Sequence, residues 1–207
     1  MVQAKAEQLQ LVFGTQGDDM ITAAAKERVF AGAGSDLVQV LEGSDGADLH
    51  GGTGEDTLRA YTDYRTLSDG NLFIGGTGGD RYEIEVIGDI YGGGHTIREQ
   101  GSAGETDTLR FFGGASPGDM RVIRDGHSLY MHQGEYGVTV NIEHFFDNAG
   151  YRIERFEFED GTVWTDKEVE QMALAMAGST GAGGSGQAQA ALEDFPNILL
   201  ASSPMIP

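Results

Sequence analysis

Short apolar stretches alternate with glycine-rich turns through the first half of the chain. The clearest example is residues 51–59, which read G-G-T-G-E-D-T-L-R. The glycines permit backbone conformations that are closed to other residues and leave carbonyl oxygens unshielded. The sixth residue, Asp56, adds a carboxylate to the turn. The eighth, Leu58, starts a short strand and points into a core. The stretch therefore predicts a tight turn followed by a half-buried strand.

The same pattern, G-G-x-G-x-D-x-U-x with U a large apolar residue, recurs along the chain. It is found at residues 14–22, 31–39 and 75–83, with one residue missing at 43–50, and in degenerate form at 66–74. Tandem nonapeptides of this kind are typical of a calcium-binding parallel β-helix. The sixth place, which supplies a carboxylate or amide oxygen, holds Asp19, Asp36, Asp48, Asp56, Asn71 and Asp80.

The spacing of the acidic residues supports this interpretation. Two nonapeptides form one coil, so turns on the same edge should recur about every 18 residues. Asp36 follows Asp19 after 17 residues, and Asp56 follows Asp36 after 20. Asp80 comes 24 residues after Asp56, so about six residues within 60–65 should bulge out of the coil. These four carboxylates are predicted to line one edge.

The opposite edge is predicted to be poorer in ligands, because it would hold only Asp48 and Asn71. Calcium takes six to eight oxygen ligands at flexible distances. An ion would therefore lie between two stacked turns, and the pairs of turns predict about two to four ions. The predicted metal-ligating residues are Gly14, Gln16, Gly17, Asp19, Gly32, Gly34, Asp36, Gly46, Asp48, Gly51, Gly52, Thr53, Gly54, Asp56, Asn71, Gly76, Gly78 and Asp80.

The second half of the chain has a different pattern. Residues 84–110 contain β-branched residues and turns without the repeat register, which predicts the far end of the stack. From residue 108 onward the pattern is that of antiparallel strands and hairpins. A capping box at residues 165–168 opens a helix that should end before Gly178. The predicted strands are residues 109–112, 120–124, 128–131, 138–142 and 152–158.

The chain is therefore predicted to be all-β, with a parallel β-roll followed by a small antiparallel β region and one C-terminal helix. Residues 1–13 would cap the stack, residues 14–105 would form the roll, and residues 106–177 would form the second domain. Residues 178–207 begin with a Gly- and Ser-rich stretch and end in a short apolar tail broken by prolines, which predicts a flexible linker and tail.

Composition narrows the range of functions. The chain has 33 acidic and 13 basic residues, so it would repel phosphate backbones, which argues against nucleic-acid binding and favours a cation as partner. The absence of cysteine excludes disulfides and thiolate metal sites. The N-terminal segment is too polar for a secretory signal, and no stretch is apolar enough to span a membrane.

The repeats at residues 14–83 resemble the RTX (repeats-in-toxin) β-roll. Residues 106–174 resemble the haemolysin-type calcium-binding-related domain, through the stretches T-D-T-L-R-F, R-D-G-H-S-L-Y-M and Y-R-I-E-R-F-E-F-E-D-G-T-V-W-T. The resemblance implies folding on calcium outside the cell and export by a type I secretion system, through an uncleaved signal in the C-terminal tail. Four departures imply fewer and weaker sites than in a long regular array: Thr15, Ala31 and Ser44 in place of Gly, and Asn71 in place of Asp.

Two functions from different classes fit this reading. The first is a non-enzymatic calcium-binding module that supports type I secretion, alone or as the C-terminal part of a larger secreted toxin, adhesin or hydrolase. The alternative is a surface adhesin or polysaccharide-binding module that uses the C-terminal β domain. The expected partners are calcium ions and the secretion machinery, or a cell-surface or polysaccharide target. In both cases we expect a secreted, extracellular or cell-surface protein.

Other readings of the same residues are weaker. The pairs Asp18–Asp19 and Glu55–Asp56 are expected to be ligands or solvated neighbours, not a catalytic acid and base. No G-K-[ST] follows the glycines, so a nucleotide-binding phosphate loop is not expected. The five histidines lack metal-hydrolase spacing and are expected in turns and on the surface. A repeat that has lost its metal would keep the glycine turns, but the recurrence of acidic residues at the sixth place favours calcium.

Overall fold

A computed structural model describes residues 10–61, 70–87, 94–102, 104–134 and 138–179. This part of the chain is mostly β with one α-helix, as predicted. The strands form two sheets, each with both parallel and antiparallel pairs.

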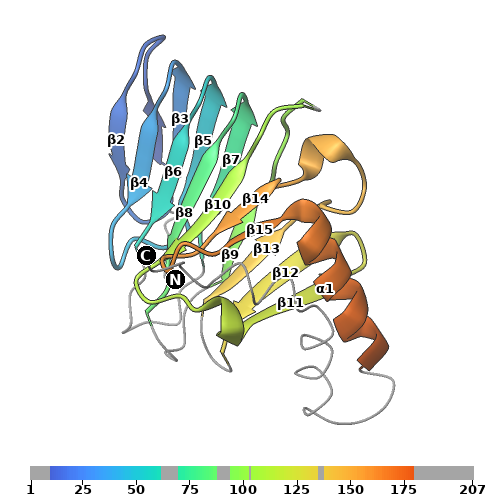
Figure 1. The fold of residues 1–207 in the computed structure, drawn as a ribbon. Coiled ribbons are helices and arrows are strands. Elements are labelled where there is room, and N and C mark those ends of the chain that lie inside the picture. The colour runs from blue at the N-terminus through green and yellow to red at the C-terminus, as the bar shows by residue number, and fades with distance from the viewer. Residues whose placement is uncertain (1–9, 62–69, 88–93, 103, 135–137, 180–207) are drawn as a thin grey trace, which may run out of the picture.

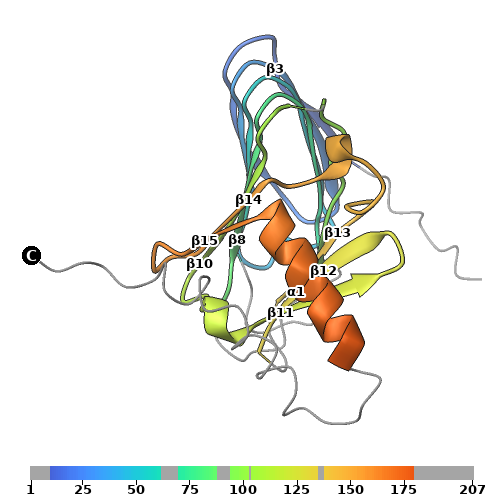
Figure 2. The ribbon, with the colours of Figure 1, turned by 45° about the vertical axis from the view of Figure 1, so that its right-hand side comes forward.

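Ten strands alternate between two facing sheets (Figures 1 and 2). The first sheet contains the odd-numbered strands β1 (Gln10–Phe13), β3 (Glu27–Ala33), β5 (Asp48–Thr53), β7 (Leu72–Thr77) and β9 (Gly94–Ile97). The second contains β2 (Met20–Ala23), β4 (Leu37–Val40), β6 (Thr57–Ala60), β8 (Arg81–Glu85) and β10 (Thr108–Phe112). All neighbours among these strands pair in parallel, so the chain winds in coils that each add one strand to each sheet.

The core between the sheets is built from the inward face of each strand. Burial alternates along β4 and β6, because successive side chains of a strand point to opposite faces. The inward residues stack in register from one coil to the next and are fully buried. They are Val29, Leu49, Phe73 and Ile97 in the first sheet and Val38, Leu58, Tyr82 and Leu109 in the second.

The C-terminal strands extend the same two sheets. In the first sheet, β9 pairs in parallel with β13 (Thr139–Ile142), which continues into the antiparallel strands β12 (Ser128–Gln133) and β11 (Met120–Asp125). In the second, β10 pairs in parallel with β14 (Arg155–Glu157), and β15 (Val163–Thr165) follows antiparallel. The region after residue 106, which was predicted to be antiparallel, is therefore mixed, because β13 and β14 join the sheets in parallel. The predicted boundary between residues 105 and 106 falls within continuous sheets. The 3-10 turns are Pro117–Asp119 and Ala149–Tyr151.

Helix α1 (Asp166–Ser179) lies against β11 and β15 at the end of the molecule where the two sheets diverge (Figures 1 and 2). Its start is the predicted capping box. The Thr165 backbone N–H donates to the Glu168 carboxylate at 2.7 Å, and the Glu168 N–H donates back to the Thr165 hydroxyl at 3.3 Å. The helix turns Val169, Met172 and Ala173 toward the core.

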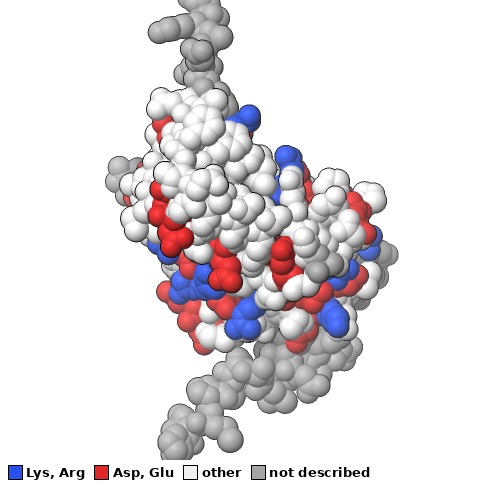
Figure 3. Space-filling view, turned by 90° about the horizontal axis from the view of Figure 1, so that it is seen from above, with Lys and Arg blue, Asp and Glu red and all other residues white. Residues whose placement is uncertain are grey.

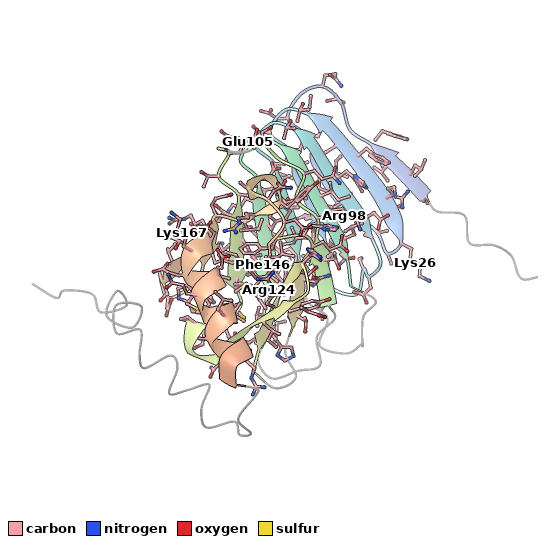
Figure 4. All side chains as sticks on the ribbon, turned by 90° about the vertical axis from the view of Figure 1, so that its right-hand side faces the viewer. Lys26, Arg98, Glu105, Arg124, Phe146 and Lys167 are labelled. Carbon is pink, nitrogen blue, oxygen red and sulfur yellow. The ribbon has the colours of Figure 1, made fainter. Side chains whose placement is uncertain are left out.

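Aromatic side chains fill the space between the sheets at the end of the molecule where α1 lies. Phe158 stacks on Phe111 and packs edge-on against Trp164, and Phe145 contacts Phe156. All five are buried. At its border, the Arg124 guanidinium lies 4.3 Å from the centre of the Phe146 ring (Figure 4).

Some sequence expectations differ from the structure or lie outside it. The strand expected at residues 152–158 is limited to Arg155–Glu157. The helix expected to end before Gly178 continues to Ser179. Of the expected N-terminal cap, residues 10–13 form β1, and residues 1–9 lie outside the described residues. Most of the segment expected to bulge at 60–65, and nearly all of the predicted linker and tail, also lie outside them.

Replacing a stacked core leucine should cost far more stability than replacing an exposed one. Leu49 is fully buried between the sheets, whereas Leu41 is 47% exposed. We expect Leu49→Ala to lower the free energy of unfolding by about 2–5 kcal/mol, and Leu41→Ala by less than about 0.5 kcal/mol. Urea unfolding in saturating calcium, followed by Trp164 fluorescence, measures both. Equal costs would contradict the assigned core.

Candidate metal centre

A ladder of aspartates runs along the edge where odd-numbered strands turn into even-numbered ones, at the top of Figure 1. Asp36 Oδ1 accepts a hydrogen bond from the Asp19 backbone N–H at 2.8 Å. Asp56 accepts from Asp36 in the same way, and Asp80 accepts from Asp56, both at 2.9 Å. The structure thus brings the four aspartates predicted to line one edge into a single row, with one aspartate in each successive coil.

The row continues beyond the residues that the repeat pattern identified. Asp107 Oδ1 accepts from the Asp80 backbone N–H at 2.7 Å, and the Asp107 N–H donates to the Glu154 carboxylate at 2.9 Å. Sequence reasoning missed Asp107, because the turn before it lacks the glycine pattern. A signal was present, since residues 107–110 repeat the D-T-L-R of residues 56–59.

The second oxygen of three of these aspartates has no partner. Among the described residues, the Oδ2 atoms of Asp36, Asp56 and Asp80 are buried without a hydrogen bond. The three residues are only 3%, 1% and 1% exposed. A buried carboxylate oxygen that loses water without gaining a partner is costly. A cation or a proton beside each Oδ2 would remove that cost.

Glycines keep the space beside two of these oxygens open, those of Asp56 and Asp80. A Cβ atom at Gly51 would lie 2.3 Å from Asp56 Oδ2, and one at Gly75 would lie 2.2 Å from Asp80 Oδ2. Glycine at the first place of the repeat therefore leaves room for a ligand next to the unpaired oxygen. At Gly14 the equivalent distance to Asp19 Oδ2 is 2.8 Å.

Glycines at the second and fourth places allow the coils to stack closely. Gly52 and Gly54 have φ of 123° and 126°, a region that favours glycine. Cβ atoms there would lie 2.1 and 1.9 Å from the carbonyl oxygens of Gly32 and Gly34 in the preceding coil. Gly76 and Gly78 repeat this arrangement one coil later. Backbone carbonyls and carboxylates are thus gathered on one edge, as the predicted ligand set requires.

The other predicted ligands of this edge lie in the same turns. Gln16 and Thr53 have exposed side chains, so we consider only their backbone carbonyls as metal ligands. The Thr53 carbonyl accepts the Gly34 N–H at 3.0 Å. The Gly17 carbonyl accepts from the Thr15 hydroxyl at 3.3 Å. Figure 3 views this edge from above, and most of its surface is uncharged with scattered Asp and Glu.

The opposite edge holds a different ladder, and the prediction for it was off by one residue. The register pairs Asp48 with Leu72, so Ala47 stands beside Asn71. The Ala47 N–H donates to Asn71 Oδ1 at 2.9 Å, and the Asn71 N–H donates to His95 Nδ1 at 3.3 Å.

The carboxylate of Asp48 is engaged elsewhere. Asp48 lies in β5, and its carboxylate accepts from Arg28 Nε at 2.8 Å. Gly46 also lies on this edge, where its N–H donates to the Gly70 carbonyl. Asp48, Gly46 and Asn71 are therefore not brought together with the aspartate row.

A hollow of about 300 Å³ opens on this second edge, bordered by Asp48, Asn71, Arg98 and Glu143. Arg98 Nε and the Glu143 carboxylate are paired there at 2.7 Å, and Figure 4 labels Arg98. His95 is buried beside Asn71, contrary to the expectation of a surface position. Burial lowers the pKa of His95 to about 4, so its imidazole is neutral near pH 7.

Electrostatics along the aspartate row favour a bound positive charge. Burial raises the pKa of Asp56 to about 6 and that of Asp107 to about 7. Burial, together with the negative charges of Glu99, Asp56 and Asp107, raises the pKa of Asp80 to about 8. Each shift means that the folded chain holds these carboxyl groups more easily as neutral acids or beside a cation.

Arginines neutralise acids on the outer faces of the sheets instead. Arg59 and Arg81 both pair with Glu83, and Arg81 also reaches Glu157. Arg98 pairs with Glu143. Among the described residues, no ion pair joins Lys or Arg to the aspartates of the row.

Residues 137–168 match the model of the haemolysin-type calcium binding protein related domain. This confirms the resemblance for part of the C-terminal region, including the third of the stretches that carried it, and it supports a calcium-binding role. No curated protein matches the chain. In the part of the chain that the structure covers, we find no helix of the length and apolarity needed to cross a membrane.

Adding a methyl group at the fourth place of a repeat should disrupt the stacking of coils. Gly78 has φ of 119°, and a Cβ there would lie 1.8 Å from the Gly54 carbonyl oxygen. Gly104 has a similar φ of 107° but nothing within 4 Å, so Gly104→Ala controls for backbone strain alone. Gly78→Ala should lower the free energy of unfolding by about 1–3 kcal/mol more than Gly104→Ala. Urea unfolding in calcium measures the difference, and equal losses would refute the close approach.

The raised pKa values predict that acid stabilises the metal-free fold. The folded chain binds more protons than the unfolded chain between the ordinary carboxyl pKa of 3.8 and the folded pKa of about 8, so stability falls as pH rises through that window. In chelator, we expect a stronger β-sheet circular dichroism signal at about pH 5 than at about pH 8.

A matched pair of variants checks the source of this effect. Asp80→Asn removes one titrating group and should weaken the pH dependence. Asp125→Asn changes an exposed aspartate of β11 and should leave it unchanged. A signal that rises from about pH 5 to about pH 8 in the wild-type chain would reverse the expected sign.

Proposed function

We propose that this chain is a calcium-binding RTX module whose coils form a parallel β-roll. The observation that carries the proposal is the row of buried Oδ2 atoms of Asp36, Asp56 and Asp80, which have no partner. For Asp56 and Asp80, the first-place glycines Gly51 and Gly75 also leave open space beside the unpaired oxygen. The similarity of residues 137–168 to the haemolysin-type calcium binding protein related domain supports the same function.

Calcium suits this edge better than other common ions. It prefers six to eight oxygen ligands at flexible distances, whereas magnesium demands a strict octahedron and keeps its waters. The edge offers carboxylates at one coil spacing and stacked carbonyls, with neither thiolate nor imidazole from the four turns. Asp19, Asp36, Asp56 and Asp80, together with carbonyls of the turns at 14–17, 31–34, 51–54 and 75–78, would hold the ions. When bound, calcium supplies the positive charge that the row lacks.

Binding and folding would be one process in this module. The site exists only when the coils are stacked, so the free energy of binding adds to the free energy of folding. Without calcium, the buried carboxylates repel one another and lose their hydration. The chain would therefore stay unfolded at the low calcium concentration of a cytosol and fold in calcium-rich external medium.

The biological role that follows is support of type I secretion. An unfolded chain can be exported, and folding outside the cell would then trap it there. The C-terminal tail within 178–207 would carry the secretion signal, on the strength of the family resemblance. The module would act in this way alone or as the C-terminal part of a larger secreted toxin, adhesin or hydrolase, and we propose no catalytic activity for it.

The alternative of a polysaccharide-binding C-terminal region has less support. A sugar-binding face usually presents exposed aromatic rings. Here Phe156, Phe158 and Trp164 are buried in the core. These three aromatic residues are therefore used for packing.

A calcium titration followed by circular dichroism tests the proposal, with magnesium as the control ion. We expect a cooperative rise in β signal with calcium only. Asp56→Asn keeps an oxygen for the Asp36 N–H but removes one charge, and it should raise the calcium concentration at the midpoint at least about tenfold. Glu55→Gln removes the same charge from the adjacent exposed residue and should leave the midpoint nearly unchanged. A β signal that is independent of calcium would overturn the proposal.

A further inference from the structure

The last coil contains a cluster of three buried carboxylates that the repeat pattern does not describe. One carboxylate oxygen from each of Asp80, Glu99 and Asp107 lies within 4.8 Å of the others. The three residues are 1%, 1% and 3% exposed. Within the described chain, none of the three pairs with Lys or Arg. Three such groups cannot all be ionised in a buried space without a cation.

Glu99 occupies the place that a glycine holds in the repeats. The register pairs Phe73 with Ile97, so counting two residues onward places Glu99 beside Gly75. A Cβ at Gly75 would lie 2.2 Å from Asp80 Oδ2 and 2.4 Å from the Tyr82 hydroxyl. The space that this glycine leaves open in its own coil is therefore next to the Glu99 carboxylate of the following coil.

The Glu99 carboxylate is held in position before any ion binds. Its Oε1 accepts the N–H groups of Gln100 and Gly101 at 2.7 and 2.9 Å. Its Oε2 accepts from the buried Tyr82 hydroxyl, which itself accepts the Gly75 N–H at 2.9 Å. A ligand whose orientation is fixed by its neighbours loses little entropy when it binds a metal.

One oxygen in the cluster still lacks a partner. Asp80 Oδ1 accepts the Asp56 N–H, whereas Asp80 Oδ2 is buried without any hydrogen bond. This oxygen lies on the Gly75 side of the turn, toward the Tyr82 hydroxyl that contacts Glu99. The cluster is thus more than a group of acids, because it contains an unsatisfied buried oxygen.

The cluster is also the junction between the parallel coils and the C-terminal region. The Asp107 carbonyl accepts the N–H groups of Glu154 and Arg155, both at 3.1 Å. The Glu154 carboxylate accepts the Asp107 N–H in return. An ion that orders Asp107 would therefore also order the start of β14, which lies within the segment similar to the haemolysin-type domain.

We propose that Asp80, Glu99 and Asp107 form a terminal calcium site that binds more tightly than the sites between glycine turns and fastens β14 to the last coil. The inference rests on the proposed function, since it assumes that this edge binds calcium. Three carboxylates in place of two give a higher ligand charge, which tightens calcium binding. The turn before Asp107 lacks the G-G-x-G pattern, and the Glu99 side chain replaces the oxygens that such a turn would supply.

Terbium luminescence tests the site on the full chain, because Tb³⁺ replaces calcium and emits when a nearby tyrosine is excited. The Tyr82 hydroxyl contacts Glu99, so an ion there should show sensitised emission. We expect Glu99→Gln to weaken the tightest terbium site at least about tenfold and to remove one bound calcium in calorimetry. Glu55→Gln is the matched control and should keep both. Tyr82→Phe should keep the calcium stoichiometry and lose most of the emission.

The outcomes separate this inference from the proposed function. If Glu99→Gln binds terbium and calcium as Glu55→Gln does, the terminal site is refuted while the glycine-turn sites stand. If the wild-type chain neither folds on calcium nor binds terbium, the proposed function fails as well. If Glu99→Gln does not fold, Tyr82→Phe decides the matter, because unchanged sensitised emission in that variant would place the tight site elsewhere.

Discussion

The structure depends on one repeated contact, in which an aspartate of each coil accepts a hydrogen bond from the backbone of the coil before it. This contact holds Asp36, Asp56, Asp80 and Asp107 in a single row. It uses only one oxygen of each carboxylate and leaves the other without a protein partner in three of the residues. The same contact that aligns the coils therefore creates the need for a cation.

The row also fixes the register of the sheets. A strand that slips by one residue turns its inward side chains to the outside, and here Val38, Leu58 and Tyr82 would leave the core together. Most of the length variation is accordingly absorbed on the other edge. Successive aspartates of the row are 17, 20, 24 and 27 residues apart, yet their turns remain stacked. Up to Asp80 the extra residues fall between an even strand and the next odd one, as between β6 and β7, whereas the last coil is longer on the row's own edge, between β9 and β10.

Sequence periodicity predicted the parts of the fold that each nonapeptide specifies by itself. Glycine places, sixth-place acids and eighth-place apolar residues identified Asp19, Asp36, Asp56 and Asp80 and the strands that follow them. The capping box at Thr165 was equally local. These features need no knowledge of other coils.

Features that depend on contacts between coils were missed. Asp48 was placed one residue out of line, because the turn at 43–50 is shorter than nine residues and only strand pairing shows that Ala47 stands beside Asn71. Asp107 was missed because its turn has lost the G-G-x-G spacing while keeping its contact with Asp80. Glu99 looks like any glutamate in sequence, and only the stacking of its position on Gly75 shows that it points at the row.

The distribution of positive charge explains why this edge depends on an inorganic ion. Basic residues are few, and the arginines of the outer sheet faces, such as Arg59, Arg81 and Arg98, are paired with glutamates there. Those pairs are partly exposed, so each adds little stability and salt screens it. The row is buried, and its repulsion is screened much less. An arginine could not enter it either, because close stacking of the glycines leaves no room for a long side chain. A small multivalent cation is the species that fits this space and matches its charge, which couples the fold to the ionic composition of the medium.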